Sequence, residues 1–253
     1  MWHVPPADLT LGDDEIHVWR VHLALTAGDI LALRRTLAAD ELARAKRFHF
    51  QEDRQRFIAA RGALRDILGR YLQRPPQEVR FRYSAHGKPL LAAAHAQEDP
   101  ADPHLQFNLA HAGDLALVAV ARRRPVGVDI ERFRPDISQE LLAARTFSPR
   151  EQAQLQALPA GLQTQGFFNC WTRKEAYVKA RGEGLSLPLD QFDVSLAPGE
   201  PAQLLHVAGD PQEAARWTLM ELAPGPDHAA ALAVPGHGWR LTCWQWQPHW
   251  RTQ

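Results

Sequence analysis

The order of strand-forming and helix-forming segments is the feature that most constrains how this sequence can fold. Residues 15–25 alternate apolar and polar side chains, as a half-buried strand does. Residues 28–72 and 138–181 carry helical periodicity instead. Further strand-like runs cover residues 79–85, 105–110, 115–121, 126–131, 192–196, 217–222, 228–234 and 239–246. This alternation of blocks predicts an α+β fold in two similar halves, residues 1–122 and 123–253.

Composition narrows the classes of function. The formal net charge of the 253 residues is zero, so the chain lacks a whole-protein basic field for binding nucleic acid. No apolar run approaches the ~20 residues that span a bilayer, and the first residues do not resemble a signal peptide. Two cysteines fit a reducing compartment. We therefore expect a cytoplasmic protein with no membrane and no nucleic-acid partner.

The segment "GVDIE" places two acids on one face of an expected strand. Asp129 and Glu131 are two residues apart, so their side chains point the same way, about 6–7 Å apart along the strand. Such carboxylates repel each other unless a cation lies between them, and oxygen ligands suit Mg²⁺ rather than zinc. The alternative interpretation is a solvated strand end with two ordinary acids.

The segment "CWTRKEAYVKARGEGL" is expected to form a helix with charges beside its buried stripe. Trp171 and Val178 define that stripe, because they lie within about 20° of each other on the helical wheel. Glu175 and Lys179 flank it on one side, and Lys174 lies on the other. Glu175 and Lys179 are either a weak surface ion pair or part of a cleft that offers a third oxygen ligand and cations for a phosphate.

Basic residues in the first half are placed where an anion could bind. Arg61 interrupts the apolar stripe of its helix, so it needs a core carboxylate, the solvent edge or a bound anion. The turn formed by Gly87, Lys88 and Pro89 presents a lysine from a rigid loop. His111 ends a strand, where it is either a surface residue or an anion ligand when protonated.

Taken in order, five segments resemble a known family: "RGALR", "GKP", "FNLAHAGD", "VGVDIE" and "WTRKEAYVKARGEGL". Their order and spacing are similar to those of the 4′-phosphopantetheinyl transferases of the large, surfactin-synthetase-activating type, whose signature pair is the last two segments. The resemblance covers residues 40–195. It implies two similar α+β halves with the active site at their junction, a design in which a monomer is sufficient.

The resemblance also implies an activity. Enzymes of this family transfer 4′-phosphopantetheine from coenzyme A to a serine of an apo acyl or peptidyl carrier protein and release adenosine 3′,5′-bisphosphate. The carriers serve fatty acid, polyketide or nonribosomal peptide biosynthesis. Magnesium, or manganese in its place, is the implied cofactor.

Site residues follow from the resemblance position by position. Asp129, Glu131 and Glu175 match the metal ligands. Glu175 is the expected base, acting through a water, and Lys179 matches the lysine that assists the leaving group. The positions that match coenzyme A contacts are Arg44, Arg61, Gly87, Lys88, Pro89, His111, Asp129, Lys174 and Lys179. The sequence departs from the family at Ala110 and Ala112, where serines often flank the histidine, so a hydroxyl contact to coenzyme A is lost.

Leucines after the helix match the region that the family uses for carrier contact. Leu185, Leu187 and Leu189 alternate along an expected loop. The alternative is that these side chains cover the core.

Two other classes of function are also compatible with the sequence. A magnesium-dependent nuclease or phosphodiesterase also uses a D-x-E pair with a further glutamate and lysine, but it needs a basic track for its substrate. A non-catalytic coenzyme A-binding module keeps the arginines and Lys88. Such a module does not need three converging carboxylates.

Overall fold

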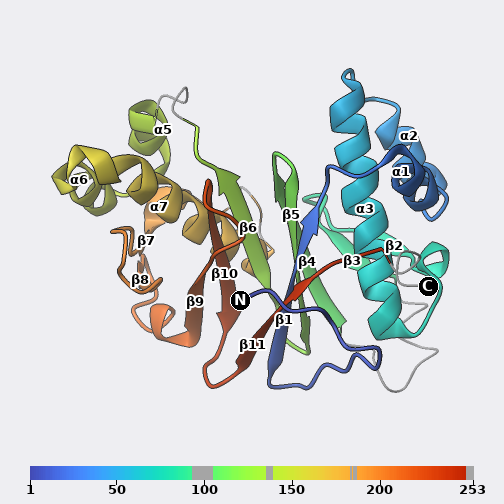
Figure 1. The fold of residues 1–253 in the computed structure, drawn as a ribbon. Helices are drawn as coiled ribbons and strands as arrows, with labels where there is room; N and C mark the ends of the chain where they lie inside the picture. Colours follow the sequence, from blue (N-terminus) through green and yellow to red (C-terminus); the bar gives the residue numbers. More distant parts are fainter. Residues whose placement is uncertain (93–104, 135–138, 183, 185–186, 249–253) are drawn as a thin grey trace. The chain divides into compact units, whose positions relative to one another are not determined.

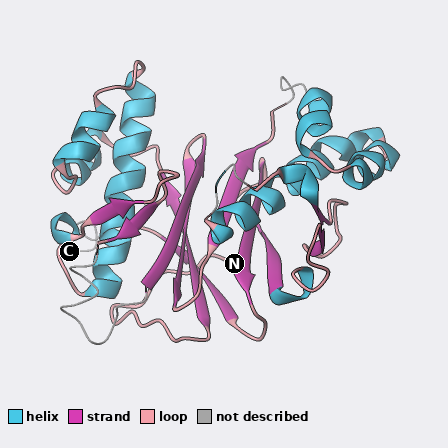
Figure 2. Ribbon diagram, turned by 180° about the vertical axis from the view of Figure 1, so that it is seen from behind, coloured by secondary structure: helices cyan, strands magenta, loops and turns pink. Residues whose placement is uncertain are grey.

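The chain forms two compact units, each built from helices packed on a sheet (Figures 1 and 2). One unit comprises Met1–Arg123 and Arg240–Gln253, and the other comprises Arg124–Trp239. The structure is a computed structural model, and it describes residues 1–92, 105–134, 139–182, 184 and 187–248. The predicted α+β class is confirmed, because both units combine helices with antiparallel strand pairs.

In the part of the chain that the structure describes, the first unit is organised around a four-stranded sheet with the order β11-β1-β5-β4. The strands are β1 (Glu15–His22), β4 (Leu105–Ala112), β5 (Leu115–Arg122) and β11 (Arg240–Gln245). The helices are α1 (Ala27–Arg34), α2 (Ala39–Ala45), α3 (Gln51–Leu72) and the 3₁₀ turn η1 (Pro76–Glu78). A short hairpin, β2 (Phe81–Tyr83) and β3 (Pro89–Leu91), carries the Gly-Lys-Pro turn.

Helix α3 supplies the core that covers this sheet (Figure 1). Its apolar stripe includes Leu64 and Ile67, both fully buried, which belong to the same cluster as Trp19 and Val118 of the sheet. The helix ends where Gln73 adopts a left-handed conformation. The prolines that follow shortly after cannot continue a helix.

The last strand differs from the sequence-based expectation. It was predicted to belong to residues 123–253 as one half, but β11 pairs in parallel with β1 of the first unit, with Glu15 opposite Arg240. Alternation of apolar residues predicts that a segment is a strand, yet it does not specify which edge the strand pairs with. The short strands β3 and β8 (Leu204–Val207) also carry too few residues for a periodic signal.

The second unit is organised around the strand order β6-β10-β9. Its strands are β6 (Gly127–Arg132), β9 (Trp217–Leu222) and β10 (His228–Pro235), with the hairpin of β7 (Phe192–Val194) and β8 beside them. Its helices are α5 (Gln139–Thr146), α6 (Pro149–Ala157), α7 (Ala160–Arg181) and the 3₁₀ turns η3 (Leu189–Gln191) and η4 (Ala214–Arg216). Strand β10 pairs antiparallel with both β6 and β9.

Helix α7 covers one face of this sheet and carries the second signature segment (Figure 1). Phe167, Cys170 and Tyr177 are buried in the same cluster as Ala231 of β10. The helix ends at Gly182, whose φ of 74° is accessible to glycine at little cost. Within the described residues, no helix combines the length and the apolar character needed to cross a membrane.

Candidate active site

Strand β6 and helix α7 bring the predicted acids and one lysine together in the second unit. Asp129 is only 4% exposed. Its Oδ1 accepts a hydrogen bond from Lys179 Nζ at 2.5 Å. Its Oδ2 is buried and has no hydrogen-bond partner among the described residues. A buried carboxylate oxygen without a partner is costly, so this atom is suited to a ligand that brings positive charge.

The three carboxylates act on one another electrostatically. Burial raises the pKa of Asp129 to about 7, although Lys179 lowers it, and the negative charges of Glu131 and Glu175 raise it further. Burial also raises the pKa of Glu131, and Glu175 contributes to that rise. Because Glu131 and Glu175 both act on Asp129, the structure places all three carboxylates in one electrostatic group.

Lys179 is the counter-charge of this group. Burial by itself lowers its pKa, but Asp129, Glu175 and Glu131 together leave that pKa above its ordinary value. The ammonium therefore stays protonated among the acids. The side chain of Glu175 is half-buried, and it accepts no hydrogen bond from a described residue. Its carboxylate is consequently available to a substrate or a water.

The donor chemistry of the group fits a hard divalent cation. Every donor is a carboxylate oxygen, as Mg²⁺ and Mn²⁺ prefer, and the partnerless Oδ2 of Asp129 marks one position that a cation would satisfy. Within the described residues, no three His, Cys, Asp or Glu side chains are already arranged at metal-ligand geometry. The ammonium of Lys179 lies against the other oxygen of Asp129.

Lys174, which was expected to contact phosphate, is held elsewhere. Its side chain is 1% exposed, and Nζ forms an ion pair with Glu151 Oε2 at 2.7 Å. The same ammonium donates to the carbonyl oxygens of Leu189 at 2.6 Å and Phe192 at 2.5 Å. These three acceptors use all three protons of the ammonium, so the structure does not bring Lys174 to the carboxylate group.

The partner of Lys174 was not predicted, although the sequence contained a signal for it. Glu151 occupies the third helical position after Ser148, the capping-box spacing at the start of α6. Ser148 N donates to Glu151 Oε2 at 2.9 Å, and Val194 N donates to Oε1 at 2.8 Å. Glu151 therefore joins the start of α6 to α7 and β7.

In the first unit, a pocket of about 550 Å³ gathers most of the remaining predicted residues. The residues that line it are Arg44, Phe48, Asp53, Arg56, Phe57, Ala60, Arg61, Gly87, Pro89, Leu109, His111 and Gly113. Five of the predicted coenzyme A contacts are among them, and they come from four different parts of the chain. The guanidinium carbon of Arg44 lies over the ring of Phe57, 5.5 Å from its centroid.

Arg61 lines the pocket but is anchored by a core carboxylate. Its Nη2 lies 2.6 Å from Glu41 Oε1, and Nε donates to the same oxygen at 2.7 Å. Nη2 also donates to the hydroxyl of Tyr83 at 3.0 Å. Of the three fates considered for this arginine, the structure shows the first. Sequence reasoning missed Glu41, which is 2% exposed.

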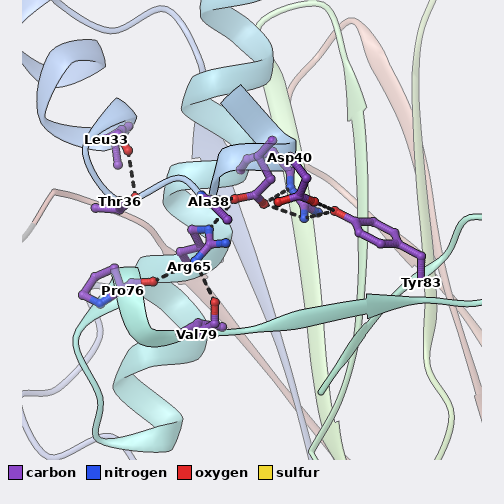
Figure 3. Close-up of polar contacts among 10 residues, drawn as sticks. Leu33, Thr36, Ala38, Asp40, Arg65, Pro76, Val79 and Tyr83 are labelled. Carbon is purple, nitrogen blue, oxygen red and sulfur yellow. Dashed lines mark hydrogen bonds and ion pairs between the residues drawn. The ribbon is translucent and has the colours of Figure 1, made fainter. Parts of the chain in front are cut away.

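Glu41 also forms an ion pair with a second arginine of α3, Arg65. Arg65 Nε donates to Glu41 Oε2 at 2.7 Å. Figure 3 shows Arg65 between Val79 and Pro76, whose carbonyls accept from its Nη1 at 2.7 and 3.2 Å. Figure 3 also shows Tyr83 directed toward Asp40, which accepts from the hydroxyl at 3.4 Å. The buried part of this cluster, Glu41 with its two arginines, holds Arg61 in place at the pocket wall.

Two further arginines, one at this pocket and one at a neighbouring pocket, were not predicted. Arg56 lines it, and its Nε donates to Asp114 Oδ1 at 2.8 Å. Arg47 lines a neighbouring pocket of about 390 Å³ together with Arg44 and Phe48. The backbone of Lys88 fixes its turn, because its N–H donates to Ser84 Oγ at 3.1 Å.

The leucines after α7 divide between described and undescribed parts of the chain. Leu187 and Leu189 are half-buried and pack against the core of the second unit. Leu185 lies outside the described residues. The two leucines with described positions thus follow the alternative in which they cover the core.

Comparison with known proteins relates both units to one group of enzymes. Residues 125–233 match the family described as the 4′-phosphopantetheinyl transferase superfamily. Residues 25–123 match the family described as 4′-phosphopantetheinyl transferase, N-terminal.

Several curated proteins are similar along most of their length. The 4′-phosphopantetheinyl transferase HetI of Nostoc sp. is 44% identical over 97% of this chain and 98% of its own length. The 4′-phosphopantetheinyl transferase Sfp of Bacillus subtilis is 34% identical over 79% of this chain and 83% of its own length. A putative 4′-phosphopantetheinyl transferase of Synechocystis sp., slr0495, is 37% identical over 61% of each chain.

Proposed function

Because the chain belongs to the 4′-phosphopantetheinyl transferase superfamily, in its Sfp-like type, we propose that it transfers 4′-phosphopantetheine from coenzyme A to a serine of an apo carrier protein. The products are the holo carrier and adenosine 3′,5′-bisphosphate. The observation that carries this proposal is the group of Asp129, Glu131, Glu175 and Lys179, which lies in the unit that the superfamily matches. The nuclease and the non-catalytic module gain no support from the relatives.

The proposed roles of the acids follow from their surroundings. Asp129, Glu131 and Glu175 would hold Mg²⁺ or Mn²⁺, which when bound supplies positive charge that neutralises the pyrophosphate of coenzyme A. The partnerless Oδ2 of Asp129 supports this role. Burial, with a smaller contribution from mutual repulsion, raises the pKa of Asp129 and Glu131, and a bound cation would offset both effects.

The reaction exchanges the phosphoanhydride bond of coenzyme A for a phosphodiester bond to the carrier serine. The serine Oγ of the carrier forms a bond to the β-phosphorus, and the phosphoanhydride bond to the departing bisphosphate breaks. Glu175 receives the serine proton through a water, a role supported by its half-buried and uncommitted carboxylate. Lys179, which is charged, donates a hydrogen bond to the departing phosphate.

The pocket of the first unit is the proposed site for the nucleotide end of coenzyme A. Arg44, Arg61 and His111 line it, and they suit the phosphates of the nucleotide. Lys88, presented by the turn of Gly87 and Pro89, is kept as a phosphate contact on the resemblance. Lys174 is removed from this set, because its ammonium is committed to Glu151 and two carbonyls.

One experiment tests the activity directly. The full chain is mixed with coenzyme A, Mg²⁺ and an apo carrier protein, and the intact carrier is weighed. A gain of one phosphopantetheine, absent when EDTA is added, is the expected result. No gain with acyl and peptidyl carriers alike would overturn the proposal.

The finer expectations each have a separate measurement. Repeating the assay with Mn²⁺ decides which metal is preferred. Light scattering of the purified chain tests the predicted monomer. Fractionation of the source cells tests the predicted cytoplasmic location.

A further inference from the structure

We propose that Gly127 is a positioning residue for the carboxylate group, because its missing side chain lets helix α7 lie directly against strand β6. This inference rests on the proposed function, since it concerns how the same site is assembled. Gly127 itself offers no group to a substrate. Its effect is exerted through the distance between two elements.

Gly127 lies on the same face of strand β6 as Asp129 and Glu131. Gly127, Asp129 and Glu131 are successive alternate residues of β6, so they face the same side of the sheet. Lys179 of α7 reaches Asp129 on that side, at 2.5 Å. Gly127 therefore lies on the face that α7 covers, at the start of the row that carries the acids.

The approach of the helix at this position is closer than any side chain permits. A Cβ built on Gly127 would lie 2.0 Å from the carbonyl oxygen of Ala176 and 2.4 Å from the backbone nitrogen of Ala180. Ordinary contact for a Cβ begins at 3.4 Å, so the elements would have to separate by more than 1 Å. The obstructing atoms are helix backbone, and a rotamer change cannot relieve the clash.

The surrounding face is also made of small side chains. Ala233 of β10 pairs with Gly127, and Ala231 pairs with Asp129. Both alanines belong to the buried cluster that contains Ala176 and Ala180 of α7. The helix thus rests on a surface of glycine and alanine, and Gly127 is the place where helix backbone and strand backbone meet.

The consequence for the site follows from sequence adjacency. Glu175 precedes Ala176, and Lys179 precedes Ala180, so the two charged residues follow any displacement of the helix turns that touch Gly127. A shift of about 1 Å in a reacting constellation can reduce turnover about 100-fold. The same shift would move Glu175 away from Asp129 and Glu131. It would therefore weaken the binding of a cation that the three carboxylates share.

The test compares Gly127→Ala with wild type in the full chain by two measurements. The first is Mn²⁺ affinity, from the free Mn²⁺ signal in electron paramagnetic resonance. The second is steady-state transfer from coenzyme A to an apo carrier. We expect Mn²⁺ binding to weaken at least about tenfold and kcat to fall about 100-fold. The KM for coenzyme A should change less than kcat, because Arg44 and His111 line the pocket of the first unit and lie on other elements.

Gly166→Ala is the matched control on the same helix. A Cβ there would meet the Leu158 side chain at 2.4 Å, so it also crowds a buried glycine of α7, but it meets a flexible side chain far from the acids. This variant should retain Mn²⁺ affinity and kcat within about twofold. Equal losses in Gly166→Ala and Gly127→Ala would show a general packing effect and overturn the proposal.

A second variant covers the case in which Gly127→Ala does not fold. Ala180→Val enlarges the helix side of the same contact, and it should lower Mn²⁺ affinity and kcat in the same direction by a smaller factor. A folded variant of either kind with wild-type Mn²⁺ affinity and kcat would contradict the proposal. If wild type binds Mn²⁺ but modifies no carrier, the proposed function fails, and the Mn²⁺ ratio still decides the role of Gly127.

Discussion

The long helices α3 and α7 carry the same arrangement in the two units. Each follows a short helix whose third residue is a buried glutamate, Glu41 in one unit and Glu151 in the other. Each glutamate accepts from a backbone N–H at the start of its own helix, at 2.9 Å in both cases. Each also binds a buried cation of the long helix that follows: Arg61 and Arg65, or Lys174.

The two arrangements differ in whether the cation of the long helix also lines a pocket. Glu41 is shared by two arginines, and Arg61 also lines the pocket of the first unit. Glu151 and Lys174 are 0% and 1% exposed, and neither lines the pocket of the first unit. A cation in a signature segment can therefore have a structural role, as part of a buried ion pair. The residues suited to chemistry are those with uncompensated charge, such as Glu175 one position further on.

Substitutions at the neighbours Glu175 and Lys174 should differ most, because one should affect activity and the other stability. We expect Glu175→Gln to lower kcat for carrier modification by about 10²–10⁴-fold, the usual contribution of a general base, with an unchanged denaturant midpoint. Steady-state kinetics with an apo carrier measures the effect. A folded Glu175→Gln enzyme with kcat within about threefold of wild type would remove Glu175 from the mechanism.

Lys174→Met should act on stability instead. Removing one partner of a buried ion pair costs about 3–5 kcal/mol, because Glu151 is left charged and buried. Urea unfolding measures this loss, and kcat per folded molecule should stay near wild type. The double variant Lys174→Met with Glu151→Gln should recover part of the stability. An unchanged urea midpoint with a raised KM for coenzyme A would mean that Lys174 contacts phosphate after all.

The two units should also respond to pH in opposite directions. In the first unit, burial lowers the pKa of His17 from 6.5 to about 4. Its stabilising contribution is full above pH 6.5 and is lost as the pH falls toward 4, by up to about 3 kcal/mol. In the second unit, the raised pKa of Asp129 makes the metal-free chain less stable as pH rises from 3.8 toward 7.

Urea unfolding across this pH range, in EDTA, separates the two effects. His17→Gln should remove the loss on the acid side, and Asp129→Asn should remove the loss on the neutral side. If either variant keeps the wild-type dependence of the unfolding free energy on pH, the corresponding group does not control it.

The smallest expected effect distinguishes the two arginines that share Glu41. Arg61→Ala should raise the KM for coenzyme A about tenfold, since it removes a guanidinium from the pocket wall. Arg65→Ala should lower the free energy of unfolding without raising that KM, because Arg65 contacts Glu41, two carbonyls and the ring of Phe81 and does not line the pocket. Equal KM values for the two variants would mean that Arg61 only supports the fold.

Sequence periodicity predicted the elements of the fold because it reports local burial. The predicted strands 105–110, 115–121 and 126–131 match β4, β5 and β6 closely, and the predicted helical block 138–181 ends where α7 ends, although it is divided into three helices. The pairing of β11 with β1 could not be predicted, because its partners are about 225 residues apart, as Glu15 and Arg240 are, and several edges could accept such a strand.

The candidate site was predictable where its residues share one element. Asp129 and Glu131 lie on one strand face, and Glu175 and Lys179 lie one helical turn apart. Lys174 was misjudged for a physical reason. Its angle on the helical wheel places it beside the buried stripe, but only the position of Glu151 decides whether that side is a cleft or a packed interior.

The route of the chain also sets an order for folding during synthesis. The second unit is one continuous segment, from Arg124 to Trp239, and all of it is available before β11 emerges from the ribosome. Strand β1, made early, lacks its parallel partner until Arg240–Gln245 has been released. Its open edge is a template for mispairing during that interval. The first unit to begin synthesis is therefore the last to be completed, and truncation at the C-terminus should damage the N-terminal sheet first.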